Sequence, residues 1–220
     1  MIRAAGWIFW KDVTLEFRGR ELLLPAGVFG LLIAMLYGFA FDPASHPLHG
    51  LFPGLLWLGI FFASFLAVGR AFSVESEASS QLLQAPIDRG AIFLAKLALN
   101  VLLTLVLAAV MTPAFSILLQ VSLPPDVGRF LLVEALGLIG FAAAGTVMGA
   151  ISAQTRLREL LLPALLLPFT SPLLLGVVSA TSALYGARSA PSGNWTLLIA
   201  IFDVIYIIVP VLLFEFLTEV

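Results

Sequence analysis

The stretch LFPGLLWLGIFFASFLAVG, residues Leu51–Gly69, contains no charged side chain. An α-helix needs roughly 20 apolar residues to cross the hydrocarbon core of a membrane, so this stretch is long enough to span one. Five more stretches of similar length and apolar character follow the same pattern: Leu22–Phe41, Leu97–Leu119, Phe130–Ala153, Leu160–Val178 and Trp195–Phe216. The pattern predicts an all-α integral membrane protein with six transmembrane helices in one domain, residues 1–220. Prolines 163, 168 and 172 are expected to bend or break the fifth helix.

The composition excludes several classes of protein. Hydrophobic residues make up 61% of the 220 residues and charged residues 11%, whereas soluble domains average about 45–50% and about 25%. A water-soluble enzyme cannot cover so much apolar surface. The net charge of −2 offers no basic field for nucleic acid, and the absence of cysteine excludes disulfides and thiolate metal sites. We therefore expect no metal site, no catalytic residues and no nucleic-acid partner.

The basic residues are distributed unevenly between the two sides of the predicted bundle. Nine of the eleven Lys and Arg residues precede the first apolar stretch or lie in the second and fourth connections, and two lie on the other side: Arg129 and Arg188. Connections rich in Lys and Arg stay in the cytoplasm. The distribution predicts a multi-pass protein of the bacterial inner membrane with both termini in the cytoplasm.

Residues 1–20 combine apolar and basic positions in a helical pattern. Ile2, Phe9, Val13 and Phe17 fall on one face, and the opposite face carries Arg3, Lys11, Thr14 and Arg18. Trp7 and Trp10 suit the depth of the lipid headgroups. The pattern predicts an amphipathic helix lying in the membrane interface. The alternative is a plain cytoplasmic extension of the first transmembrane helix.

Residues 70–95 form the longest polar piece of the chain and are expected to face the cytoplasm. Acidic residues near the start, two leucines and the helix-terminating Pro86 predict a short helix, Ser73–Gln84, that a partner protein can contact. The residues with suitable chemistry are Glu75, Glu77, Gln81, Leu82, Leu83, Asp88 and Arg89. The alternative is a solvated loop that only connects two helices.

Four segments of the chain resemble ABC-2 type permeases, and more specifically the haem exporter protein B family, the membrane subunits of the cytochrome c maturation haem exporter. The segments are RAAGWIFWKDVTLEFRGRE (residues 3–21), LLWLGIFFASFLAVGRAFSVE (55–75), LLQAPIDRGAIFLAKL (82–97) and SAQTRLRELLLPALLLPFTSPLLL (152–175). The resemblance covers nearly the whole chain. It implies an interfacial N-terminal helix, six transmembrane helices and a coupling helix between the second and third.

The resemblance also implies partners and a function. The partners are an ABC ATPase subunit, a second copy of the chain, a haem-handling membrane protein and a periplasmic haem chaperone. ATP hydrolysis on the ATPase subunit would drive release of the haem-loaded chaperone. The chain itself has no Gly-x-x-x-x-Gly-Lys-Ser/Thr phosphate-binding loop, so we expect ATP to be bound by the partner and no cofactor by this chain. Haem is the candidate substrate.

Three polar residues fall inside the predicted transmembrane helices. Asp203 lies deepest, and two roles are open: a proton or substrate path, or a polar contact between helices. Glu134, nearer the end of its helix, is expected to reach headgroup water. Asn100, one turn from Thr104, is expected to form a hydrogen bond to another helix.

His46 and His49 lie three residues apart in the first outer connection and are candidates for contact with haem. Two ordinary loop histidines are the alternative. For the whole chain, three other functions remain open: an ABC-2 permease for a lipid or drug, a membrane scaffold that transports nothing, and a proton-coupled carrier that uses Asp203.

Overall fold

The computed structural model describes residues 2–43, 48–82, 89–152, 158–186 and 193–216. Every regular element in these residues is an α-helix. The helices are α1 (Ile2–Gly19), α2 (Leu23–Phe41), α3 (Phe52–Leu82), α4 (Arg89–Leu118), α5 (Val127–Ser152), α6 (Arg158–Leu184) and α7 (Trp195–Phe216). The predicted all-α architecture is confirmed.

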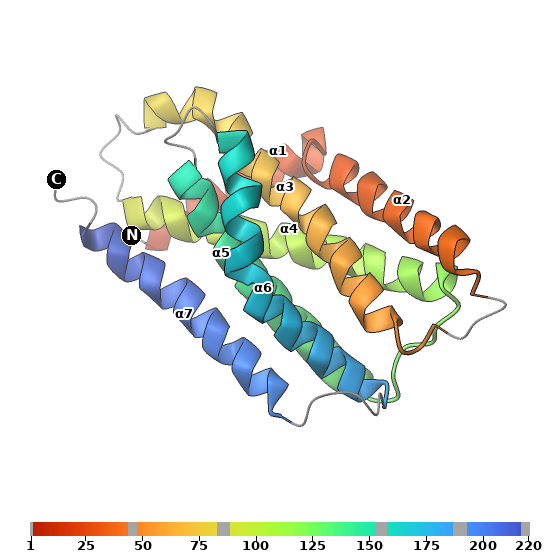
Figure 1. The fold of residues 1–220 in the computed structure, drawn as a ribbon. Coiled ribbons are helices and arrows are strands. Elements are labelled where there is room, and N and C mark those ends of the chain that lie inside the picture. The colour runs from red at the N-terminus through yellow and green to blue at the C-terminus, as the bar shows by residue number, and fades with distance from the viewer. Residues whose placement is uncertain (1, 44–47, 83–88, 153–157, 187–192, 217–220) are drawn as a thin grey trace.

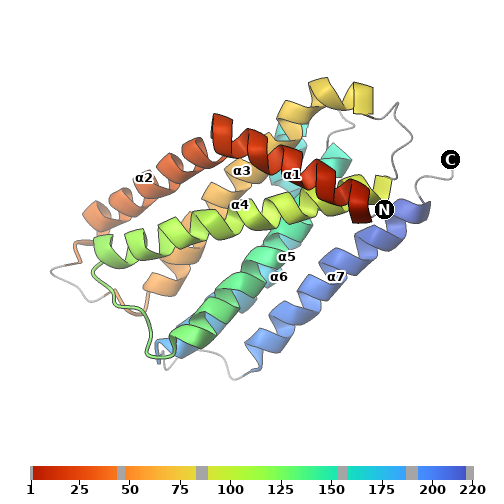
Figure 2. The same ribbon diagram turned by 180° about the vertical axis from the view of Figure 1, so that it is seen from behind.

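Helices α2 to α7 form a bundle in which successive helices run in opposite directions (Figure 1). Helix α5 is central and packs against α3, α4, α6 and α7. Helix α1 lies outside the bundle, along the N-terminal half of α4 (Figure 2). As a result, α1 begins and α7 ends at the same end of the bundle, as the sequence predicts.

Five helices are long and apolar enough to cross a membrane. The segments are Leu23–Phe41, Phe52–Gly69, Gly90–Leu118, Val127–Gly149 and Ala164–Leu184. The sixth predicted stretch forms α7, in which Trp195–Pro210 is a shorter apolar run. The chain is therefore a multi-pass membrane protein by the length and composition of its helices.

The helices extend further at one end of the bundle than hydropathy predicts. Helix α3 continues past Gly69 to Leu82, bending as it leaves the bundle (Figure 1), and α4 already begins at Arg89. Within the predicted cytoplasmic segment 70–95, residues up to Leu82 thus belong to α3 and residues from Arg89 belong to α4. Hydropathy marks where a helix leaves the hydrocarbon, but a polar helix can continue beyond that point.

The three prolines of α6 are expected to bend or break it, and since the helix is continuous through them, they do not break it. Proline 172 has no N–H and leaves the carbonyl oxygen of Pro168 without its usual helical donor. The Ser171 hydroxyl donates a hydrogen bond to that oxygen at 2.7 Å. Membrane helices tolerate proline where a nearby side chain satisfies the freed carbonyl in this way.

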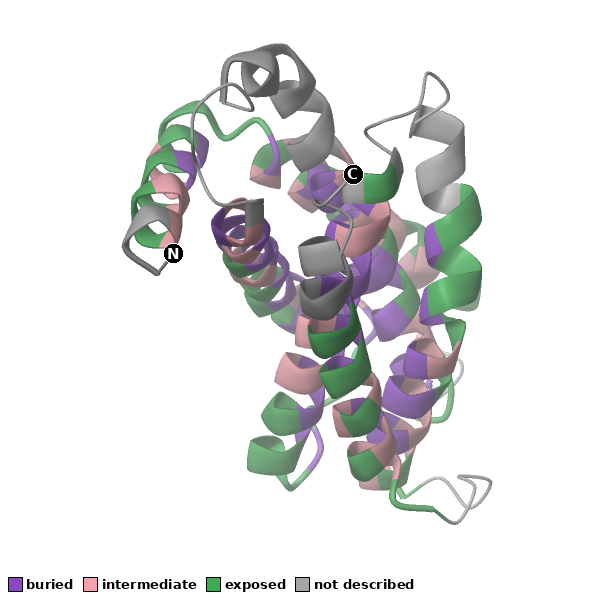
Figure 3. Ribbon diagram, turned by 90° about the vertical axis from the view of Figure 1, so that its left-hand side faces the viewer, coloured by how far each residue is buried: buried purple, intermediate pink, exposed green. Residues whose placement is uncertain are grey.

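Close helix packing depends on glycines that face large side chains. A Cβ atom on Gly59 of α3 would overlap with the ring of Phe115 on α4. A Cβ atom on Gly137 of α5 would lie 2.5 Å from Val177 and 2.6 Å from Trp57. Figure 3 shows the buried residues on the helix sides that face the bundle interior. Small residues allow helices to approach in membranes, where dispersion contacts replace the hydrophobic effect as the main attraction.

We expect Gly59→Ala to destabilise the chain by about 1–3 kcal/mol, because the added methyl group overpacks the contact with Phe115. Gly54→Ala on the same helix is the matched control, since nothing lies within 4 Å of its Cβ position. There alanine should be neutral or stabilise by up to about 1 kcal/mol. Thermal unfolding in detergent compares the two. Equal midpoints for the two variants would show that the glycine contact is not tight.

Candidate functional site

A buried ion pair joins α1 to α4. The ammonium of Lys96 lies 2.5 Å from Oδ2 of Asp12, and both side chains are 7% exposed. Lys11, half-exposed, approaches the other carboxylate oxygen at 3.0 Å. Two opposite charges out of water attract strongly, and removal of Lys96 would leave buried Asp12 with the half-exposed Lys11 as its remaining cation in the described residues. The pair therefore fixes α1 against the part of α4 that follows residues 83–88.

A second carboxylate of α1 fixes the start of α2. Glu16 is buried and accepts hydrogen bonds from the backbone N–H groups of Leu22, at 3.0 and 3.2 Å, and Leu23, at 2.8 Å. The first N–H groups of a helix have no partner inside the helix, and a negative charge there is favoured by the helix dipole. Glu16 thus caps α2 from the preceding helix and sets the corner between α1 and α2.

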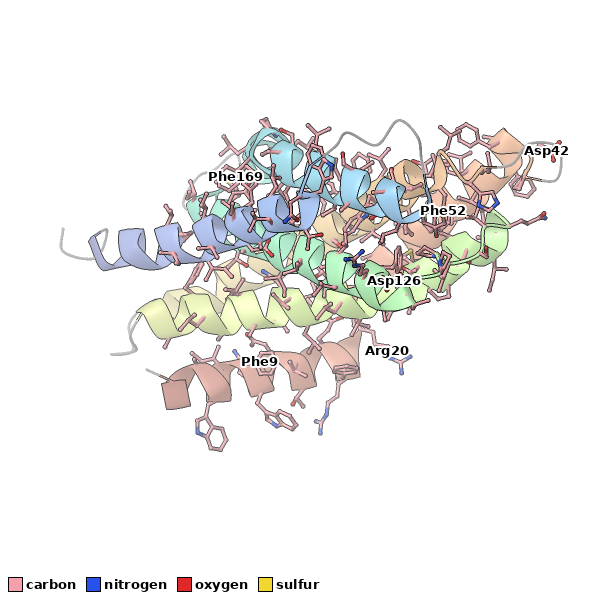
Figure 4. All side chains as sticks on the ribbon, turned by 90° about the horizontal axis from the view of Figure 1, so that it is seen from below. Phe9, Arg20, Asp42, Phe52, Asp126 and Phe169 are labelled. Atoms are coloured by element: carbon pink, nitrogen blue, oxygen red, sulfur yellow. The ribbon has the colours of Figure 1, made fainter. Side chains whose placement is uncertain are left out.

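The packing face of α1 differs from the predicted apolar face. Phe9 and Val13 pack with Leu22, Leu99 and Leu103, and Figure 4 shows Phe9 on the side of α1 that faces α4. Phe17 does not share this face and is 57% exposed. The grouping of Phe17 with Phe9 and Val13 was therefore wrong, because Asp12 and Glu16 occupy the buried side.

The outer face of α1 exposes aromatic and basic side chains. Trp7 and Trp10 are 77% and 66% exposed, and Lys11 and Arg18 are exposed with them. This combination suits the membrane–water interface, where tryptophan rings and basic groups meet lipid headgroups. The interfacial helix remains a prediction, with its two faces now assigned.

The predicted coupling residues lie at the end of the bundle that also carries α1. Positions 75, 77, 81 and 82 belong to the last part of α3, and Arg89 begins α4. Leu83 and Asp88 lie outside the described residues. The helix predicted for Ser73–Gln84 thus exists at least to Leu82, as a continuation of α3.

Inside the bundle, Asn100 forms the predicted hydrogen bond to another helix. Its amide Nδ2 on α4 donates to Oγ1 of Thr146 on α5 at 2.9 Å, and both residues are fully buried. The Thr146 hydroxyl donates in turn to the carbonyl of Ala142. Thr104 bonds within its own helix, to the carbonyl of Asn100. The arrangement supports a structural role for Asn100.

Glu134 does not reach headgroup water as predicted. The residue is 7% exposed, and its carboxyl accepts a hydrogen bond from the hydroxyl of Thr112 on α4. The neighbouring helix therefore covers the side chain, although Glu134 is close in sequence to the start of α5. This contact is a second polar link between α4 and α5.

Asp203 is 5% exposed, and neither of its carboxyl oxygens has a hydrogen-bond partner in the described part of the chain. It lies on α7 against α5 and α6. The two predicted histidines are elsewhere: His49 is exposed in the connection between α2 and α3, and His46 lies outside the described residues. Among the residues that are described, no three or more His, Asp or Glu side chains gather as metal ligands.

Sequence reasoning missed the ion pair and the cap, although one signal for them was present. Phe9, Asp12, Val13 and Glu16 follow the i, i+3, i+4, i+7 spacing of a single helix face. Two acids within that stripe indicate a face with polar partners. Lys96, close to the start of an apolar stretch, is the corresponding signal on α4.

We expect Lys96→Met to destabilise the chain by up to about 3–5 kcal/mol, because Asp12 stays buried after losing its nearest cation. Adding Asp12→Leu should recover most of that loss, since no buried charge remains. Lys11→Met is the control and should cost at most about 1 kcal/mol, as Lys11 is half-exposed. Thermal unfolding of the wild-type chain, Lys96→Met, Asp12→Leu and the double variant forms a double-mutant cycle. Independent, additive losses from the two substitutions would contradict a direct pair.

Comparisons with known proteins identify the family to which this sequence belongs. A family model described as CcmB protein matches residues 3–216. A protein named "Heme exporter protein B" from Rhodobacter capsulatus is 31% identical over 173 residues, covering 75% of this chain and 76% of the relative. The protein of that name from Pseudomonas aeruginosa is 30% identical over 190 residues, covering 84% of each. A third, from Paracoccus denitrificans, is 30% identical over 184 residues, covering 82% of each. The chain belongs to the CcmB protein family.

Proposed function

We propose that this chain is the permease subunit of a haem exporter that acts in cytochrome c maturation. The observation that carries the proposal is the family match over residues 3–216. It is supported by relatives named "Heme exporter protein B" that align over most of their length. The matched residues include parts of all seven helices, so the resemblance is not confined to one segment.

In this proposal ATP is hydrolysed by a separate ABC ATPase subunit. The chain has no phosphate-binding loop of its own. The contact surface for the ATPase comprises the predicted coupling residues Glu75, Glu77, Gln81, Leu82, Leu83, Asp88 and Arg89. The continuation of α3 to Leu82 supports this role, because a helix transmits displacement better than a loop.

The contacts of α1 suggest how displacement would travel from the coupling residues. Helix α4 starts at Arg89, the last of the coupling residues, and holds α1 through Lys96 and Asp12. Helix α1 holds the start of α2 through Glu16. Movement at the start of α4 would therefore shift α1 and α2 together.

The remaining partners follow from the same family. A second copy of the chain, a haem-handling membrane protein and a periplasmic haem chaperone would complete the complex in the bacterial inner membrane. ATP hydrolysis would drive release of the haem-loaded chaperone. Six transmembrane helices, α2 to α7, would place both termini in the cytoplasm. His46 and His49 would then lie on the periplasmic side, where contact with a haem carrier would occur.

A second candidate is a membrane scaffold that transmits ATPase movement without carrying a substrate. One cavity among the described residues, between α3, α5 and α6 and bordered by Trp57, Ser64 and Leu173, has room for about one water molecule and is too small for haem. No feature of the described residues specifically favours a permease for another substrate, such as a lipid or drug.

Reporter fusions test the proposed topology. Cytoplasmic reporters joined after Gln84 and Arg158 should be active, and those joined after His46 and Arg188 should be inactive. The reason is the retention of Lys- and Arg-rich connections in the cytoplasm. A reversed pattern of activity would overturn the orientation and, with it, the cytoplasmic place of the coupling residues.

A double substitution tests the proposed function itself. Leu82→Asp with Leu83→Asp should leave the chain inserted in the membrane, because both positions follow the apolar part of α3. The variant should fail to retain the ATPase subunit on co-purification, since loss of an interface anchor typically costs about 2 kcal/mol or more. Cytochrome c maturation in a strain lacking the native chain should be lost.

The control is Lys11→Gln with Arg18→Gln, on the exposed face of α1 and outside the proposed coupling residues. This variant should keep the ATPase at wild-type stoichiometry. Full ATPase retention and full maturation with the leucine variant would remove Leu82 and Leu83 from the coupling surface. Normal maturation without the chain would reject the proposed function as a whole.

A further inference from the structure

Asp203 occupies a notch that exists because residue 140 is glycine. Oδ1 of Asp203 on α7 points at the Cα of Gly140 on α5, so closely that any Cβ there would overlap with the oxygen. The methyl carbons of Leu173 on α6 lie 2.9 and 3.2 Å from the same Cβ position. Three helices thus enclose the carboxyl group, which is 5% exposed.

No charged group compensates Asp203 in the described residues. Gly140 faces it from α5 and Leu173 from α6. On its own helix the nearby titratable group is Tyr206, whose hydroxyl donates to the carbonyl of Phe169 at 2.5 Å.

Two ionisable groups of the neighbouring helices have partners of their own. Glu134 on α5 accepts from Thr112, and Lys96 on α4 pairs with Asp12. Both carboxyl oxygens of Asp203 stay without a hydrogen bond.

An ionised carboxylate without partners is strongly disfavoured in such a place. An isolated charge in a medium of low dielectric constant loses its hydration energy, and the group binds a proton instead. The notch fits the neutral acid, which carries no net charge to be solvated. The apolar surroundings exclude water from Asp203. For the same reason they favour the protonated form of its carboxyl group.

A small cavity close to the notch is lined almost entirely by apolar side chains. Leu173 borders the Asp203 carboxyl and also lines this cavity, together with Ser64, whose hydroxyl oxygen is buried without a partner in the described residues. A cavity with such walls holds no water on its own, because a buried water needs at least two polar partners. While α7 is packed, the cavity therefore offers no water to accept the proton of Asp203.

We propose that Asp203 is a proton-binding site of the bundle. Its carboxyl holds a proton while α7 is packed against α5 and α6. It releases the proton to water when the contact with Gly140 opens. The step leaves a carboxylate on Asp203 and a proton on water, with no other reactant. Proton binding at Asp203 requires neither haem nor the ATPase. The proposal can therefore be tested independently of the proposed function.

Infrared spectroscopy of the full chain in lipid bilayers tests the site directly, because the C=O stretch of a neutral carboxyl is separate from the bands of a carboxylate. The chain is made with aspartate carrying ¹³C in its side-chain carboxyl. At neutral pH we expect a neutral-acid band that shifts with the label, and therefore belongs to aspartate. Absence of a label-sensitive band in the wild-type chain would overturn the proposal without any variant being needed.

Two pairs of variants assign the band. It should disappear in Asp203→Asn and remain in the control Glu134→Gln. Gly140→Ala should abolish or shift it, because the methyl group drives the carboxyl out of the notch, whereas Gly128→Ala, on the same helix but with only an ordinary contact to Asp126 at 3.7 Å, should leave it unchanged. A band that persists in Asp203→Asn, or is unaltered in Gly140→Ala, would contradict the site.

Discussion

Lipid hydrocarbon supplies no hydrogen-bond donor or acceptor, so the polar side chains of α4 must find their partners inside the protein. Lys96 pairs with Asp12 of α1, Asn100 with Thr146 of α5, and Thr112 with Glu134 of α5. The first pair joins α4 to α1. The other two join α4 to α5 at two different positions along the helices. Because the partners lie at defined heights, the three contacts set the register of α1 and α5 along α4. Apolar packing alone permits sliding between neighbouring rows of side chains.

The other helices are attached mainly by shape. Helix α2 turns a row of small residues, Ala26, Gly30 and Ala34, towards the bundle and exposes large apolar side chains elsewhere. A Cβ on Gly30 would lie 3.2 Å from the Cβ of Ala63 on α3 and closer still to Met111 on α4. Such contacts gain dispersion energy only at close approach, which requires small residues. The polar pairs thus set the position of neighbouring helices along each other's axes, and the small residues set how closely the helices approach.

The sequence predicted the elements well because each transmembrane helix carries its own signal, an apolar run of sufficient length. Contacts between elements were predicted poorly. Asp12 and Lys96 are 84 residues apart in the sequence. Considered separately, each is typical of a charged residue at the membrane interface, so the sequence does not indicate that they pair. The face of α1 was assigned from apolar residues, which placed Phe17 on the wrong side. Glu134 was expected to reach water because it lies near the end of its apolar stretch. The sequence does not indicate that Thr112 of the neighbouring helix covers its side chain. Hydropathy indicates which residues are removed from water. It contains no information on which side chains surround them instead.

Helix α7 differs from α4 in how it is held, and this difference bears on where the bundle can change shape. Its hydrogen bond to α6 runs from Tyr206 to the carbonyl of Phe169, and its remaining contacts there include Ile199 against Gly176. Its buried acid, Asp203, has no partner on α5. Separating α1, α4 and α5 would expose charges and break side-chain pairs, which is costly in lipid. Separating α7 from α5 would break no side-chain pair at Asp203 and would allow water to reach a carboxyl that is unsatisfied when packed. A rearrangement driven from the proposed coupling residues would therefore move α1, α2, α4 and α5 as one body, with the boundary at α7 as the place where the bundle opens.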